Sequence, residues 1–146
     1  MDKLTFDSGI KEYEVNGRSV LRFNPSDPNV YGRFLDAVEK IKAIEDEMVK
    51  NGRKSTDGES VVRVMVSADK NVKEVLQNVF GKQNDFDSIF DGVNIMAVAS
   101  NGERVITNFM SAIEPIISEG AEKCAKQKVN EAVKAARMDR DRRVNA

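Results

Sequence analysis

The sequence predicts an α+β fold that is mainly α: an N-terminal β-hairpin, with room for a third strand, followed by four to five helices. Alternating apolar and polar residues flank Asn16-Gly17, whereas later apolar residues recur at steps of three and four. The length of 146 residues and the hydrophobic fraction of 40% suit one domain with one core. We therefore expect a single domain over residues 1–137 and a charged, frayed tail over 138–146.

The first segment reads as extended, since Leu4 and Phe6 alternate with polar neighbours. Asn16-Gly17 indicates a type I′ turn, because both of its central positions need positive φ. A two-residue turn predicts the cross-strand pairs Val15–Arg18, Tyr13–Val20 and Ile10–Phe23. Apolar side chains then lie on both faces of the hairpin. One face can pack on helices, and the other can meet a third strand or another molecule.

The segment Asn24-Pro25-Ser26-Asp27-Pro28 predicts the start of the first helix, with Ser26 or Asp27 as N-cap and Pro28 in the first turn. Its apolar stripe holds Phe34, Val38, Ile41, Ile44 and Met48. Gly52 is expected to end the helix in a left-handed conformation. A polar, mobile loop should follow over residues 53–59.

The next segment has two interpretations. Val61–Val66 is rich in β-branched residues, which is typical of a strand that would continue the sheet. However, apolar residues continue at steps of three and four as far as Phe80-Gly81, which favours one long helix closed by Gly81.

A short amphipathic turn is predicted over residues 85–91, with Asp85 as its N-cap. No element is assigned to residues 92–101. A further helix should begin after Asn101-Gly102.

Two residues are expected to interrupt this further helix. Pro115 predicts a kink near residues 111–114, because proline removes a backbone hydrogen bond. Gly120 could extend the break, so a separate last helix is predicted over residues 121–137, with a thin apolar stripe.

The residue types in the sequence argue against catalysis and metal binding. There is no histidine and one cysteine, Cys124, so the commonest general base, a Cys-His pair and an ordinary zinc site are excluded. Calcium-loop registers beginning at Asp85 or Asp87 fail, because Ile89 falls on a position that needs an oxygen ligand. We expect no enzyme, no metal and no cofactor, and we interpret Cys124 as a small, buried or half-buried apolar residue.

The charge balance gives little support for nucleic-acid binding. Lys and Arg number 23 against 24 Asp and Glu, a net charge of −1, which creates no long-range field for a polyanion. The basic residues near the C-terminus, Arg137, Arg140, Arg142 and Arg143, alternate with Asp139 and Asp141. No signal-peptide pattern and no long apolar run is present, so we expect neither secretion nor a membrane span.

The order of elements, together with several short motifs, resembles a known family. These motifs are Phe23-Asn24-Pro25-Ser26-Asp27-Pro28, Val79-Phe80-Gly81, Asn108-Phe109 and Glu114-Pro115-Ile116, and a Lys/Ala-rich helix follows them. In this order they are similar to the tail assembly chaperones of tailed bacteriophages of Gram-positive hosts. The resemblance implies a non-enzymatic protein in the cytoplasm of a bacterial host cell that binds the tape-measure protein and also tail-tube subunits.

A protein with that role needs an exposed apolar surface that accepts an amphipathic helix. The candidate partner-binding residues are Phe86, Ile89, Phe90, Val105, Phe109, Ile113 and Ile117. The same residues could instead pack on one another as core, or mediate homo-oligomerisation. Two other functions stay open: a structural or adaptor component of a phage particle, and, with weaker support, a DNA-associated phage regulator.

Overall fold

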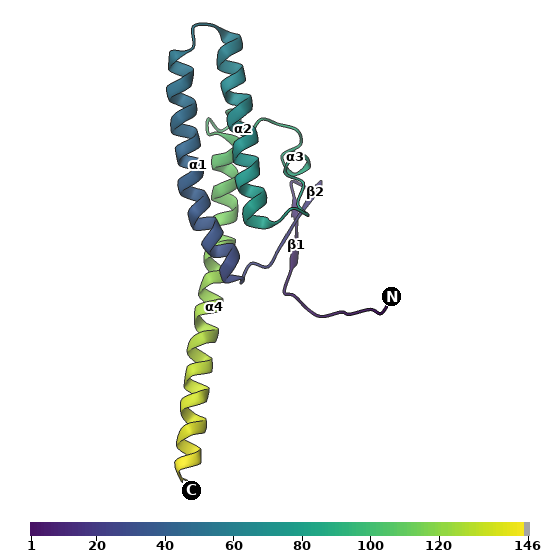
Figure 1. Ribbon diagram of the computed structural model, residues 1–146, viewed down its shortest axis with the longest axis vertical. Coiled ribbons are helices and arrows are strands. Elements are labelled where there is room, and N and C mark those ends of the chain that lie inside the picture. Colours follow the sequence, from purple (N-terminus) through teal and green to yellow (C-terminus); the bar gives the residue numbers. More distant parts are fainter. Residues whose placement is uncertain (145–146) are drawn as a thin grey trace.

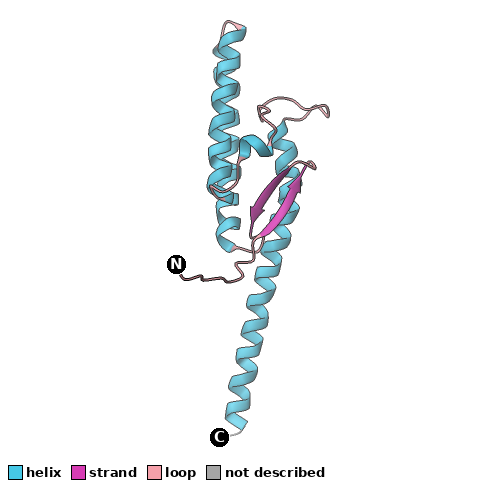
Figure 2. Cartoon of the chain, turned by 90° about the vertical axis from the view of Figure 1, so that its right-hand side faces the viewer, coloured by secondary structure: helices cyan, strands magenta, loops and turns pink. Residues whose placement is uncertain are grey.

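The computed structural model describes residues 1–144, which form two strands and four helices. The strands are β1 (Lys11–Val15) and β2 (Ser19–Phe23), and the helices are α1 (Pro28–Lys54), α2 (Gly58–Phe80), α3 (Phe86–Ile89) and α4 (Val105–Val144). In Figure 1, α1 and α2 stand side by side, the first half of α4 lies against them, and the hairpin and α3 lie on one flank. Figure 2 shows the hairpin in front of α4, with the second half of α4 projecting beyond the body. The predicted mainly helical α+β fold is confirmed.

The hairpin forms as predicted, but its register differs by one residue. Three residues connect the strands, and the Arg18 N–H donates to the Val15 carbonyl at 3.1 Å. Asn16 and Gly17 do adopt positive φ, of 51° and 68°. The pairs on one face are Lys11–Phe23, Tyr13–Leu21 and Val15–Ser19, and those on the other are Glu12–Arg22 and Glu14–Val20. Because a shift by one residue exchanges the two faces, the expected apolar character on both faces is wrong: one face is apolar and the other is mainly charged.

Helix α1 begins where the capping signals predict and ends later than expected. The Asp27 carboxylate accepts the Asn29 N–H at 2.9 Å, which makes Asp27 the N-cap, and a proline follows in the first turn. Gly52 stays helical, because the Ser55 N–H donates to the Gly52 carbonyl at 3.2 Å and closes the last turn. The predicted left-handed end at Gly52 is therefore wrong, and the loop over 53–59 shrinks to residues 55–57.

Helix α2 is one continuous helix, so the strand interpretation of Val61–Val66 is wrong. Asp57 accepts the Ser60 N–H at 2.7 Å and caps the N-terminus. Gly81 ends the helix at a φ of 105°, as predicted. The helical spacing of the apolar residues outweighs the β-branched composition, because it gives the helix one apolar face that packs on α1.

The short helix α3 has the predicted N-cap, since Asp85 accepts the Ser88 N–H at 3.2 Å. The following segment, which the sequence left unassigned, folds back toward α4. It places Ile95 and Met96 at zero exposure in the core, and the Ile95 N–H donates to the Asp69 carboxylate on α2 at 2.8 Å. This segment is therefore a packed part of the body.

Helix α4 is continuous from Val105 to Val144, so the predicted separate helix over 121–137 is wrong. Pro115 and the residue four positions earlier, Ser111, are exposed, and the carbonyl that loses its hydrogen bond can meet water instead. The segment expected to fray is helical as far as Val144, and residues 145–146 lie outside the described part of the chain.

Gly120 allows α4 to pack closely against the turn at Pro25. A Cβ at this position would lie 1.7 Å from the Pro25 carbonyl oxygen, so only glycine lets α4 approach the turn that precedes α1.

The core lies where α1, α2, α4 and the hairpin meet. Its aromatic part begins with Phe23 and Phe80, whose ring centroids are 4.9 Å apart, and continues from Phe80 to Phe86 at 6.1 Å. Phe90 and Phe109 close the cluster at 5.1 Å. This cluster fixes α3 and the hairpin to α4.

Candidate partner-binding surfaces

The seven predicted partner-binding residues come together, but mostly inside the protein. Phe86, Ile89, Phe90, Ile113 and Ile117 are at most 9% exposed, and Val105 and Phe109 are half-buried against the core. In this structure they therefore form core rather than an exposed groove, as the alternative interpretation held. The short helix α3 packs on α2 and β2, and Phe90, which follows it, packs edge-on against Phe109 of α4.

Four of the seven residues border a hollow of about 440 Å³ beside the hairpin. We name it the hairpin hollow, lined chiefly by Val15, Ile89, Phe90, Val93, Val105, Phe109 and Ala112. Its polar lining comes from Asn16, Asp91 and Asn108. The side chains that the sequence singled out therefore contribute one wall of a surface hollow while belonging to the core.

A second apolar hollow lies between α1 and α4. We name it the α1/α4 groove: it has a volume of about 390 Å³ and is lined by Phe34, Val38, Ile41, Ile106, Thr107 and Met110, with Lys42, Glu45, Ser111 and Glu114 around them. Val38, which belongs to the apolar stripe predicted for the first helix, is 44% exposed. Sequence reasoning missed this groove because two neighbouring stripes of α4 are apolar: Val105 and Phe109 face the hollow, whereas Ile106 and Met110 face α1.

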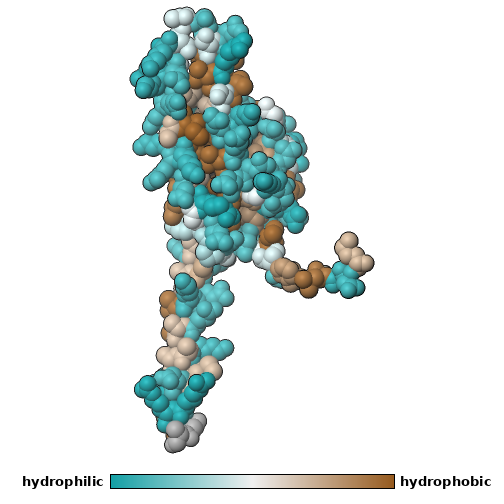
Figure 3. All heavy atoms as spheres, viewed as in Figure 1, coloured by the Kyte–Doolittle hydropathy of each residue, from teal (hydrophilic) through white to brown (hydrophobic). Residues whose placement is uncertain are grey.

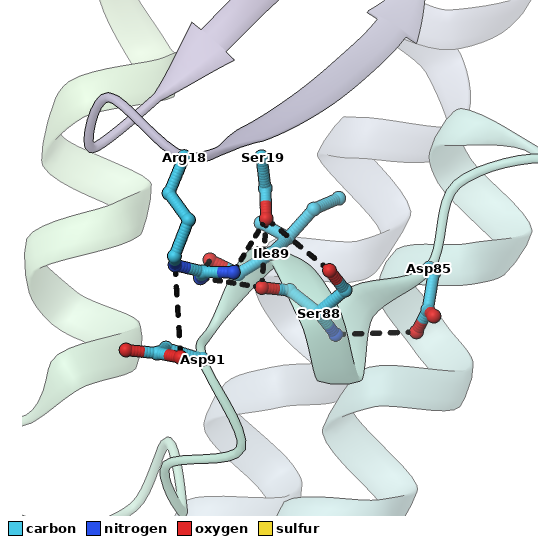
Figure 4. A network of polar contacts seen from close by, with 6 residues as sticks. All are labelled: Arg18, Ser19, Asp85, Ser88, Ile89 and Asp91. Carbon is cyan, nitrogen blue, oxygen red and sulfur yellow. Dashed lines mark hydrogen bonds and ion pairs between the residues drawn. The ribbon is translucent and has the colours of Figure 1, made fainter.

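A polar junction joins the hairpin turn to α3, as Figure 4 shows. The Arg18 guanidinium donates to the Ser88 carbonyl and lies 3.6 Å from the Asp91 carboxylate. The Ser19 hydroxyl donates to the same Ser88 carbonyl at 2.9 Å. These groups satisfy one another's hydrogen bonds across the junction, so the arrangement is a structural clasp between the hairpin and α3.

Asn84 is a buried polar residue that the sequence did not single out. At 2% exposure, its amide accepts the Arg22 N–H at 2.8 Å and donates to the Arg22 carbonyl at 2.9 Å. It also donates to the Phe80 carbonyl at 2.8 Å. The side chain thus pairs with the outer edge of β2 as a neighbouring strand would.

Few side chains have a shifted pKa, and the shifts have structural causes. Burial alone would lower the pKa of Lys73, but hydrogen bonds to Asp69 and Asp87, each at 3.1 Å, outweigh it and raise that pKa above the ordinary value. The pKa of Tyr13 is also raised, first by burial and then by the nearby Glu119 carboxylate. Neither group faces a reactive partner: Lys73 ties α2 to α3, and Tyr13 stacks on Phe23.

Two segments project from the body, which spans residues 11–120. The arm, residues 1–10, has no regular secondary structure and exposes Leu4 at 89% and Phe6 at 75%. The stem, residues 121–144 of α4, is exposed throughout except at the half-buried Ala121 and Cys124, which agrees with the interpretation of Cys124. In Figure 3, hydrophobic side chains gather in the seam between α1 and α2 and again on the arm.

The described residues offer no evidence of a metal or membrane site. Within residues 1–144, no group of three or more Cys, Asp or Glu side chains is placed to hold a metal ion. No helix among them combines the length and apolar character needed to cross a membrane. Every buried side-chain N or O atom in this part of the chain has a hydrogen-bond partner.

Comparison with known proteins gave no match: no family model, no curated protein and no solved structure is similar to the chain at a significant level.

Proposed function

We propose that the protein is a non-enzymatic phage tail assembly chaperone that binds amphipathic helical segments of the tape-measure protein in the cytoplasm of the host. The α1/α4 groove carries this proposal, because two parallel walls of apolar side chains offer a site for a third helix. The choice of the tape-measure protein as partner rests on the resemblance of the sequence motifs to tail assembly chaperones.

The groove has the spacing that helix recognition needs. Phe34, Val38 and Ile41 lie at steps of four and three along α1, and Ile106 and Met110 lie four residues apart on α4. A partner helix with large apolar residues at i, i+3 or i+4, and i+7 could place them between these two rows.

The rim of the groove can select the orientation of the partner helix. Lys42 and Glu45 border it on α1, and Glu114 borders it on α4. A partner helix with acidic and basic residues beside its apolar stripe would meet complementary charges there, which favours one orientation and register over others.

Co-expression with the tape-measure protein tests this proposal. The wild-type chain should form a complex that keeps the tape measure in solution. Val38→Asp and Thr107→Arg each put a charge into the groove at a residue that is already exposed, so both variants should fold normally and lose the complex.

The matched control is Val62→Asp, which places the same charge at a 58% exposed position on α2. It should retain the complex, and circular dichroism should show equal helix content in all variants. A wild-type chain that does not associate, or two groove variants that bind as the control does, would overturn the proposal.

Mass spectrometry of purified virions separates a chaperone from a structural or adaptor component. A chaperone acts during assembly and should be missing from mature particles. Stoichiometric presence of the chain in those particles would favour the structural function instead.

A further inference from the structure

The arm is fixed at its root in a direction that leads away from the body. The Asn24 amide donates to the Ser8 carbonyl at 3.1 Å, and the Gly9 N–H donates to Asp7 at 2.8 Å. Gly9 has a φ of 74°, and a Cβ there would lie 2.7 Å from the Asn24 amide nitrogen. Asn24 follows β2, so the root of the arm is held beside the end of β2, and Figure 1 shows the arm running from there away from the body.

The two edges of the sheet differ. On β2, the outward N–H and C=O of Arg22 pair with Asn84. Because outward and inward groups alternate along an antiparallel ladder, Glu12, which is opposite Arg22, and Glu14 point their N–H and C=O away from β2. Within the described residues β1 pairs only with β2, so this edge of β1 is open to another strand.

The side chains beside the open edge match those of the arm on both faces. On the inner face, Tyr13 and Val15 are half-buried, and Val15 also lines the hairpin hollow. On the outer face lie the carboxylates of Glu12 and Glu14.

In an extended arm, Leu4 and Phe6 share one face, whereas Lys3 and Thr5 share the other. In the register that places this apolar pair beside Tyr13 and Val15, Lys3 falls on the face of the two glutamates, and this holds for either direction of the arm along β1.

We propose that the arm of one copy adds as a third strand to the open edge of β1 in a second copy, where Leu4 and Phe6 cover the hairpin hollow. The second copy is the occupant because the root of the arm is held beside the end of β2, away from its own open edge. The chain therefore carries a donor strand and a matching acceptor that do not meet within one molecule. This self-association is independent of the proposed chaperone function.

Analytical ultracentrifugation of the full chain is the first test. A wild-type mass of about twice 16.3 kDa is expected. The concentration range should extend to about 200 µM, because a single added strand buries less than about 1,200 Å² and associates weakly. A monomer throughout this range would overturn the proposal.

The donor and the acceptor can be blocked separately. Phe6→Lys should raise the dissociation constant of the dimer at least about tenfold, or 1.4 kcal/mol, whereas Thr5→Lys on the opposite face of the arm should leave it unchanged or lower it. Glu14→Pro removes only an outward N–H of β1, and its control Glu14→Ala keeps that N–H. Persistence of the dimer in both Phe6→Lys and Glu14→Pro would overturn the proposal.

Mixing the blocked chains distinguishes arm donation from loss of folding. A chain lacking residues 2–7 keeps its open edge, and Glu14→Pro keeps its arm, so each alone should be monomeric and the mixture should form one-to-one dimers. Failure to form that mixed dimer would overturn the proposal. So would an arm that folds onto its own β1, seen as a monomeric wild type destabilised by the deletion.

Discussion

The body buries its apolar side chains, whereas the two projecting segments leave theirs exposed. In the body, the aromatic cluster is buried and Asn84, though polar, makes three hydrogen bonds. In the arm and the stem, apolar side chains such as Phe6 and Val129 are 75% and 61% exposed. The body can therefore fold within one chain, whereas the projections gain burial only from another molecule.

Charge separates the two regions as well. The stem carries eight basic and four acidic residues, a net charge of +4, which leaves −5 on the rest of the chain. An isolated helix is marginal in water because most helical stability comes from packing, and the stem packs against nothing along most of its length. We therefore expect the stem to open far more often than the helices of the body.

The largest predicted effect tests how closely α4 packs in the body. Gly120→Ala should lower the free energy of unfolding by about 3 kcal/mol, because its Cβ would overlap the Pro25 carbonyl and force backbone movement. Gly32→Ala and Gly52→Ala, which have open space in α1, should be neutral or stabilising by up to about 1 kcal/mol. Denaturant unfolding measures all three, and equal stability of Gly120→Ala and the wild type would refute the close packing.

The next effect concerns the buried amide. Asn84→Ala should cost about 2 kcal/mol in denaturant unfolding, because it leaves backbone groups of Arg22 and Phe80 without partners. Asn78→Ala, at an exposed position of α2, is the control and should change stability by less than about 0.5 kcal/mol. Equal losses in the two variants would contradict the pairing of Asn84 with β2.

A smaller effect should appear in alkaline solution. The folded pKa of Lys73 is raised, so its contribution to stability is complete below the unfolded pKa, near 10.5, and disappears as the pH rises through the folded pKa. The wild type should exceed Lys73→Met in unfolding free energy by about 1 kcal/mol at pH 8, and the gap should close above pH 11. A gap that stays constant across that range would contradict the ion pairs with Asp69 and Asp87.

The smallest effect is expected from removing most of the stem. A chain ending at Lys126 should unfold within about 0.5 kcal/mol of the full chain, because the deleted residues are exposed and lie outside the body. Its helical circular dichroism should fall in proportion to the residues removed. A large loss of stability would show that the stem supports the body.

Local signals predicted the secondary structure well, and contacts between distant segments explain where they failed. Asp27, Asp85 and Gly81 act at helix ends as their residue types indicate. The residue type of Gly120 indicates a helix break, but the glycine is required because the Pro25 turn packs so closely that a side chain would not fit. That turn is far away in sequence, so no local pattern reveals the contact. The hairpin register likewise depends on burial of one face, which an Asn-Gly pair alone does not specify.

The candidate site was predictable only in part, for a related reason. An apolar stripe on α4 has the same sequence pattern whether α3 covers it or it lines an open groove. Val105 and Phe109 were selected on that pattern, but the α1/α4 groove uses the adjacent residues Ile106 and Met110. Which stripe of α4 lines the groove depends on where α1 packs, and the spacing of residues within α4 does not show this.

Hydrogen exchange of the chain, free and in complex with the tape-measure protein, is the sharpest test of helix binding in the α1/α4 groove. In the complex, new protection is expected at residues 34–45 and 106–114, which border this groove, and no change is expected on the outer face of α2 around Val62. A stable complex that leaves both groove segments unprotected would contradict binding in the groove.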